Sequence, residues 1–306
     1  MKTCLVAGEL NVDLILRGYS SFPEPGKEIL VDQCALALGS ATAICAMGLA
    51  HLGTKVAFLG VVGDDPWGRF CLENLKSRAI DVSRVRTENA LHTGITVAIA
   101  SPGDRALVTF LGASTALAGS DLSEEVLAGF QHLHVSSYFL QQRLRPSLGD
   151  VFARATRLGL TTSLDPGYDP SETWSDDLRQ VLAQVDVFLP NESELRGLVH
   201  LSDLEEALRT LENGRTLTVA KLGSQGAAAL QSGRLLRVPA FAVTPVDTTG
   251  AGDSFGAGFL DAWLRGEPLR SALRQGAACG ALSTLGLGGT ARQPDRAEAQ
   301  ALLASR

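Results

Sequence analysis

Short apolar runs alternate with helical patterns along most of this 306-residue chain, and no other feature limits its fold as strongly. The apolar runs, which are typical of buried strands, lie at 3–8, 55–61, 132–136, 160–164, 185–189 and 217–220. The helical patterns lie at 40–52, 66–78, 146–158 and 203–212, and two Gly/Ala-rich helical stretches follow at 251–265 and 269–283. Strands that alternate with helices form a mostly parallel sheet with helices on both faces. The sequence therefore predicts an α/β fold.

Two segments depart from this alternation. Residues 12–37 and 93–111 carry short stretches with alternating apolar residues, such as TGITVAIA and ALVTFLG, and the turn Ser101-Pro102-Gly103-Asp104 joins the last two. These patterns indicate antiparallel strands in a small sheet separate from the main one. Length alone suggests about two domains, but no Pro/Ser-rich linker divides the chain. We expect one domain, 1–306, with a β-appendage built from these segments.

Composition excludes several classes of protein. A formal charge of −6 and an aromatic content of 6% argue against nucleic-acid partners. The N-terminus lacks a secretion pattern, and no apolar run approaches the ~18–20 residues that span a bilayer. We expect a cytoplasmic protein without a membrane partner. The cysteines are odd in number and never in CxxC spacing, which predicts buried free thiols at Cys4, Cys34, Cys45, Cys71 and Cys279.

The segment DTTGAGDSFGAGFL, residues 247–260, carries the chemistry. Gly250, Ala251 and Gly252 form a small-residue turn directly before an amphipathic helix, so that backbone N–H groups and the helix N-terminus can bind an anion. Asp253 would lie beside that anion and could accept a proton from an attacking hydroxyl, as phosphoryl transfer requires. The alternative for such a turn is a plain helix cap with glycines for close packing.

The 247–260 segment resembles the C-terminal signature of the ribokinase-like (PfkB) carbohydrate kinases, and the similarity extends over nearly the full chain. GDDPWG at 63–68 is similar to a turn of that family, and Leu164-Asp165-Pro166 to the end of one of its strands, although Gly167 replaces the usual Asn. PNESE at 190–194 carries the family's N-x-x-E motif. The resemblance implies a ribokinase-like fold in which the small sheet is a lid over a sugar and a possible homodimer contact.

The resemblance also implies roles for individual residues. Asp13, at the end of the first-strand motif ELNVD, would bind the sugar together with Gly39 and Ser40, and Asp253 would be the base beside the amides of residues 250–252. The residues that the resemblance implies in nucleotide binding are Asn191, Lys221, Gly223, Ser224, Gly226, Gly250 and Gly252. Mg²⁺ would be held mostly by nucleotide phosphates and water, with Asn191 and Glu194 in its outer shell.

One departure from the family concerns the sugar site. The family's first signature usually reads G-G-x-x-x-N, whereas LGSATAICAMGLAHLG at 38–53 keeps Gly39, has Ser40 at the second glycine, and has Ile44 or Ala43 in place of the Asn. Because the missing amide would bond a sugar hydroxyl, a standard ribokinase specificity is not expected.

The remaining candidates are less specific. His132 and His134 would face one side of a strand, and a structural role outweighs metal binding. Arg105, Arg143 and Arg145 could grip an anionic substrate or be solvated surface charges. Asp247 and Thr249 could cap a turn or line a monovalent-cation site for K⁺.

The resulting hypothesis is an ATP-dependent sugar kinase that uses Mg²⁺. One alternative is a nucleoside kinase on the same scaffold. The other is a sugar- or nucleotide-binding sensor without turnover.

Overall fold

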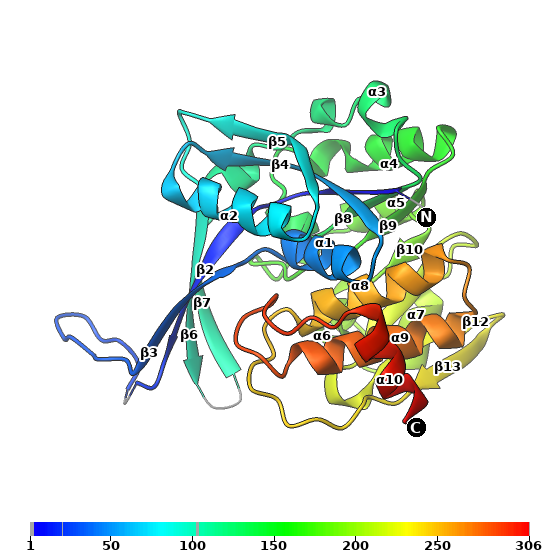
Figure 1. The fold of residues 1–306 in the computed structure, drawn as a ribbon. Helices are drawn as coiled ribbons and strands as arrows, with labels where there is room; N and C mark the ends of the chain where they lie inside the picture. Colours follow the sequence, from blue (N-terminus) through cyan, green and yellow to red (C-terminus); the bar gives the residue numbers. More distant parts are fainter. Residues whose placement is uncertain (1–2, 20, 102–103, 306) are drawn as a thin grey trace.

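A nine-stranded sheet forms the centre of the molecule (Figure 1). The computed structural model describes residues 3–19, 21–101 and 104–305, with the side chains of 100–105 left out. The side chain of Arg105 and part of the predicted 101–104 turn therefore lie outside the description. The strand order is β13-β12-β11-β10-β9-β8-β1-β4-β5. These strands are β1 (Thr3–Ala7), β4 (Lys55–Gly63), β5 (Asp81–Glu88), β8 (His132–Val135), β9 (Thr161–Leu164), β10 (Val187–Phe188), β11 (Leu217–Lys221), β12 (Ala227–Gln231) and β13 (Arg234–Val238).

Pairing in this sheet is parallel from β5 to β11 and antiparallel across β11, β12 and β13. The parallel part confirms the prediction from the alternating pattern, and all six predicted strands are present. The β12–β13 hairpin and the edge strand β5 were not predicted. Ser232 and Gly233 close the hairpin with φ values of 51° and 71°, the left-handed geometry that two-residue hairpin turns favour.

Helices cover both faces of the sheet, as expected (Figure 1). One face packs against α4 (Leu148–Arg157), α5 (Asp177–Leu182), α6 (Glu192–Val199) and α7 (Leu204–Thr210). The other packs against α1 (Ala41–His51), α2 (Pro66–Ser77), α8 (Ala251–Leu264) and α9 (Leu269–Ser283). The short α3 (Glu124–Leu127) lies beside α4, and α10 (Arg296–Ala304) packs on α9. The six predicted helices are therefore confirmed, within a few residues at each end.

A second sheet of four strands projects from the first (Figure 1). It has the order β3-β2-β6-β7 and contains β2 (Asn11–Arg17), β3 (Gln33–Leu38), β6 (Gly94–Ser101) and β7 (Asp104–Phe110). Its outer pairings are antiparallel, and the central β2–β6 pairing is parallel. The small separate sheet confirms the prediction, and we call it the lid sheet from here on. Cys34 on β3 is exposed, so the expectation of five buried thiols is wrong for this one residue.

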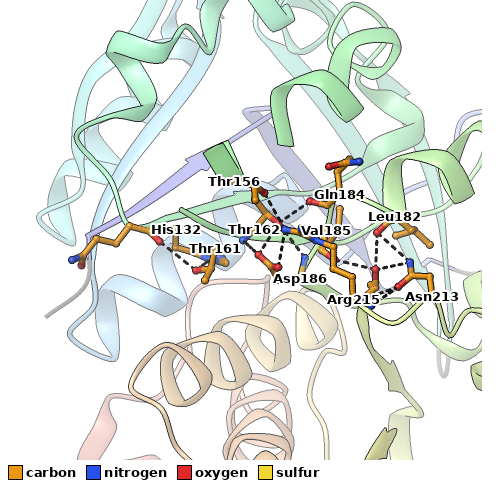
Figure 2. Close-up of polar contacts among 12 residues, drawn as sticks. His132, Thr156, Thr161, Thr162, Leu182, Gln184, Val185, Asp186, Asn213 and Arg215 are labelled. Carbon is orange, nitrogen blue, oxygen red and sulfur yellow. Dashed lines mark hydrogen bonds and ion pairs between the residues drawn. The ribbon is translucent and has the colours of Figure 1, made fainter. Parts of the chain in front are cut away.

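Polar side chains fix the amino ends of β9, β10 and β11 at the edge of the sheet away from the lid sheet (Figure 2). Asp186, directly before β10, accepts hydrogen bonds from the amide and hydroxyl of Thr162 at 2.8 and 3.1 Å, and from Arg215 at 2.9 Å. Because buried backbone ends must be hydrogen-bonded, this carboxylate holds the three strands in register. Their opposite, carboxyl ends carry the residues described next.

Candidate active site

The turn before α8 has the geometry of an anion site. Gly250 is the N-cap residue with φ 71°, and Asp253 lies in the first helical turn. The amide of Ala251 donates to the Thr248 carbonyl at 3.2 Å, whereas the amides of Gly250 and Gly252 have no hydrogen-bond acceptor among the described residues. Of the three amides expected at the anion hole, these two are therefore available to a ligand, with the helix N-terminus behind them.

Close packing explains why glycine occupies position 250. A Cβ atom there would lie 2.7 Å from the Cα of Gly289 and 3.0 Å from Cγ2 of Ile44. The chain thus needs glycine at this point both for its left-handed backbone and for its contact with the 286–290 loop. Ile44 is only 3% exposed and fills the space beneath this turn, so the position expected to hold a sugar-binding amide instead supports the anion site.

Asp247 ties the start of the turn to the 286–290 loop. One carboxylate oxygen accepts from the amide and hydroxyl of Thr249 at 3.0 and 2.8 Å, and the other accepts from the Gly288 amide at 2.9 Å. This is the turn-capping arrangement that the sequence left open, and a K⁺ site beside it stays a prediction. Just ahead, Arg17 on β2 donates to the Val246 carbonyl at 2.9 Å and so connects the lid sheet to this segment.

Asp13 and Gly39 lie together where the lid sheet meets the main sheet. A Cβ atom at Gly39 would collide with the Asp13 carboxylate, which is why this position is glycine. Asn11 donates to Asp13 Oδ1 at 3.2 Å and to Thr96 Oγ1 at 3.3 Å. Ser40 caps α1 and donates to the Glu9 carbonyl at 2.6 Å. These side chains present oxygen and nitrogen atoms that suit the hydroxyl groups of an acceptor.

Glu9 organises this end of the site, although it was not among the predicted site residues. It is buried and accepts from Thr42 Oγ1 at 2.5 Å, from Ser137 Oγ at 2.7 Å and from Gln141 Nε2 at 2.9 Å. It therefore joins the end of β1 to the start of α1 and to the segment after β8. Its place in the ELNVD motif was the only signal that the sequence offered.

Four charged side chains meet at the carboxyl ends of β9, β10 and β11. Lys221 Nζ lies 2.5 Å from Asp165 Oδ2, and both residues are buried. Burial alone would lower the pKa of Lys221, but Asp165, Glu194 and Asp253 together hold it above the usual range. Burial raises the pKa of Glu194 to about 7, against the opposing effect of Lys221. Asp165 was noted only as part of a strand end, and its pairing with Lys221 was not foreseen.

The N-x-x-E motif forms the capped start of α6. Asn191 Oδ1 accepts from the Glu194 amide at 2.9 Å, and Glu194 Oε2 accepts from the Asn191 amide at 2.7 Å. No group of three or more His, Cys, Asp or Glu residues in the described chain is arranged to hold a metal ion. One carboxylate and one amide fit Mg²⁺ that takes its other oxygen ligands from phosphates and water.

One cavity of about 360 Å³ connects these groups. Its lining includes Asp13 and Ser40 at the lid sheet, Asn191, Glu194 and Lys221 at the strand ends, and Thr249, Gly250, Gly252 and Asp253 at the turn. The structure thus brings most of the predicted site residues together around one space. Gly223, Ser224 and Gly226 lie in the turn between β11 and β12 and do not line the cavity. Gly39 and Ala251 do not line it either, but each is next in sequence to a lining residue.

The other candidates lie elsewhere. His132 and His134 form a buried hydrogen-bonded chain with Ser163, at 2.8 and 2.7 Å, in line with a structural role. Arg145 pairs with Asp177 at 2.8 Å and does not line the cavity, nor does Arg143.

Comparison with known proteins agrees with this geometry. Residues 1–296 match the pfkB family carbohydrate kinases. The chain belongs to this family. It is 32% identical, over 100% of its length and 99% of the relative, to an "ATP-dependent ribose-1-phosphate kinase" of Halopiger xanaduensis. It is 33% identical to a fructokinase of Klebsiella pneumoniae, over 96% of this chain and 97% of that protein. As a PfkB kinase it is a phosphotransferase with an alcohol group as acceptor.

Solved structures show the same fold. A putative ribokinase II from E. coli has a TM-score of 0.88 at 23% identity, and each chain covers 100% of the other. A double mutant of a fructokinase from Vibrio cholerae O395, bound to fructose, ADP and potassium ion, has a TM-score of 0.82 at 28% identity, with 99% of this chain and 98% of that chain covered. The ribokinase-like fold of this PfkB kinase is thereby established. Across the described residues, no helix combines the length and apolar character of a membrane span.

Proposed function

We propose that this PfkB kinase transfers the γ-phosphoryl group of ATP to a hydroxyl of a monosaccharide or sugar derivative. The observation that carries the proposal is the position of Asp253, which lies in the first turn of α8 beside the two available amides and lines the same cavity as Asp13. An acceptor held near Asp13 under the lid sheet would place a hydroxyl between this carboxylate and a bound phosphate. One domain, 1–306, would then supply the whole site.

In this mechanism Asp253 accepts the proton of the attacking hydroxyl, and the amides of Gly250 and Gly252 stabilise charge on the transferring group. Asn191 and Glu194 would lie toward Mg²⁺, which when bound neutralises phosphate charge. The nucleotide would extend past Lys221 toward the turn at 223–226, and K⁺ would bind beside Asp247 and Thr249. The lid sheet would exclude water from the reacting groups.

The replacement Asp253→Asn tests the proposal. It keeps the shape of the side chain and removes its ability to accept the proton, so turnover should fall at least ~10²-fold while nucleotide affinity changes little. The measurement is ADP release across pentoses, ketohexoses, sugar acids and nucleosides, with ATP affinity from calorimetry. Near-wild-type turnover of the variant would contradict the mechanism.

The same screen separates the proposal from its alternatives. Phe110 on the lid sheet and Tyr168 line the cavity and are about half exposed, so they could stack on the base of a nucleoside. ADP release with nucleosides but not with sugars would favour the nucleoside kinase. ATP binding without ADP release in any case would favour a sensor.

We also propose that the lid sheet forms a homodimer contact. On its face away from Asp13, Leu36, Leu14, Val97 and Val108 are paired across the four strands in one apolar row. Val108 is 63% exposed and Leu36 37% exposed. A second copy of the chain would remove this row from water.

A further inference from the structure

Lys221 has more hydrogen-bonding capacity than the protein around it uses. Its ammonium group carries three N–H donors, and one donates to Asp165 at 2.5 Å. The other two have no acceptor among the described residues, although Lys221 is only 8% exposed. A buried ammonium group with two unused donors is costly unless a ligand completes its hydrogen bonds. Because Lys221 lines the cavity, that ligand would lie in the cavity.

The direction of Lys221 indicates which part of the ligand it would meet. A Cβ atom built on Gly252 would have Lys221 Nζ as its nearest neighbour, at 3.6 Å. The ammonium group therefore lies next to the backbone of the turn whose amides are available to an anion. A group that receives hydrogen bonds from the Gly250 and Gly252 amides would also be within reach of Lys221.

The charge of the cavity lining favours a contact between Lys221 and an anionic ligand. Its lining includes five carboxylates, those of Glu9, Asp13, Asp165, Glu194 and Asp253. Among the described lining residues, Lys221 carries the one cationic side chain. A transferring phosphoryl group brings further negative charge into this space. Lys221 is the one described lining side chain that can offset this charge with a positive charge of its own.

We propose that Lys221 is a catalytic residue that contacts the transferring phosphoryl group, and that Asp165 is the positioning residue that holds its ammonium group there. This inference rests on the proposed kinase function. In the step concerned, the acceptor oxygen forms a bond to the γ-phosphorus, the bond from that phosphorus to the β–γ bridging oxygen breaks, and the hydroxyl proton goes to Asp253. Lys221 stays protonated throughout, in keeping with the raised pKa that its three acidic neighbours give it.

Three variants test the two roles: Lys221→Met, Asp165→Asn and the double variant K221M/D165N. We expect Lys221→Met to lower kcat at least ~10²-fold and to change the KM for ATP less than about threefold, because the contact strengthens as charge develops on the phosphoryl group. Asp165→Asn keeps the cation but loosens its position, and should lower kcat about tenfold. In the double variant the Asp165→Asn change should cost nothing further, since Asp165 acts through Lys221.

Stability and binding measurements separate a loss of catalysis from a loss of folding or of nucleotide binding. Lys221→Met leaves a buried carboxylate without its partner and could unfold the protein, whereas the double variant removes both charges and should unfold near the wild-type temperature. ATP and ADP affinities from calorimetry, without acceptor, should stay within about threefold of wild type. Lys76→Met, on the exposed end of α2, is the matched control and should leave all of these values unchanged.

Four outcomes would overturn the inference, and the last of them would also overturn the proposed function. A double variant with kcat within threefold of wild type would show that Lys221 is structural. If the Lys221 variants lose nucleotide affinity but keep kcat, Lys221 contacts the bound nucleotide equally in the ground state and the transition state. An additive effect of Asp165→Asn in the Lys221→Met background would contradict the positioning role. Absence of ADP release by the wild-type protein would contradict the proposed function itself, and with it this inference.

Discussion

At the scale of single residues, Gly250 is tightly restricted. Its left-handed backbone starts α8, and its α-carbon faces the backbone of Gly289. Gly256, further along the same helix, has ordinary helical surroundings, because a Cβ there would lie 3.7 Å from Cδ1 of Leu189. Gly250 at the N-cap of α8 and Gly256 within it therefore differ in whether they can accept a side chain.

We predict that Gly250→Ala destabilises the protein by at least ~2 kcal/mol, from the left-handed backbone and the collision with Gly289. It should also reduce turnover by displacing the anion site. Gly256→Ala is the control and should be neutral or stabilising by up to ~1 kcal/mol, since alanine favours helix. Denaturant midpoints and ADP release check both. Equal stability of the two variants would contradict this account of the turn.

Local sequence was sufficient to predict the surroundings of Asp253, but not the pairing of Lys221 with Asp165. Asp253 and its glycines are contiguous, so that turn, helix start and carboxylate can be inferred together from 247–260. The Lys221–Asp165 pair joins residues 56 positions apart and exists only because β9 and β11 flank β10. Glu9 likewise obtains its partners from the segment after β8. Such contacts depend on strand order, which no single motif specifies.

At the level of the element, β8 and β9 share a buried polar chain. His134 Nδ1 lies 2.7 Å from Ser163 Oγ, and His134 Nε2 lies 2.8 Å from Ser136 Oγ. Burial lowers the pKa of His134 to about 4. Since the unfolded chain would take up a proton near pH 6.5 and the folded chain does not, stability is lost as the pH falls from about 6.5 toward 4.

We predict that His134→Asn weakens this pH dependence. The histidine contributes roughly 2 kcal/mol of lost stability at pH 5, which the variant lacks. Glu194, with its pKa raised to about 7, contributes with the opposite sign, so the difference between variant and wild type isolates the histidine. Chemical denaturation at pH 7 and pH 5 measures it, with the exposed His200→Gln as control. An unchanged slope in His134→Asn would argue against the prediction.

Elements were predictable where their side chains are uniformly buried. The parallel strands in the middle of the sheet have apolar runs because helices cover both faces. The edge strand β5 is half exposed and reads DVSRVRTE, so it has no such run. The β12–β13 hairpin was missed although Ser232-Gly233 is a typical turn pair.

At the level of the whole molecule, the proposed homodimer contact on the lid sheet can be tested. We predict a dimer in solution that Val108→Asp converts to monomer, because a charge would be placed in the apolar row that joins the copies. Light scattering after size exclusion measures the mass. Leu158→Asp changes a comparably apolar, exposed side chain at the end of α4 and is the control. A monomeric wild-type protein would exclude the lid contact.

The hydrogen bond between Arg17 and the Val246 carbonyl couples strand β2 of the lid sheet to the segment that precedes α8. β2 carries Asp13, which lies where the acceptor would bind. Four residues further along the same strand, the guanidinium group of Arg17 donates to the carbonyl just before Asp247. A strand is stiff over this distance of roughly 13 Å. Tilting of the lid sheet over an acceptor would therefore pull directly on the segment leading into α8, and recognition of one substrate would be transmitted to the loop that holds the other.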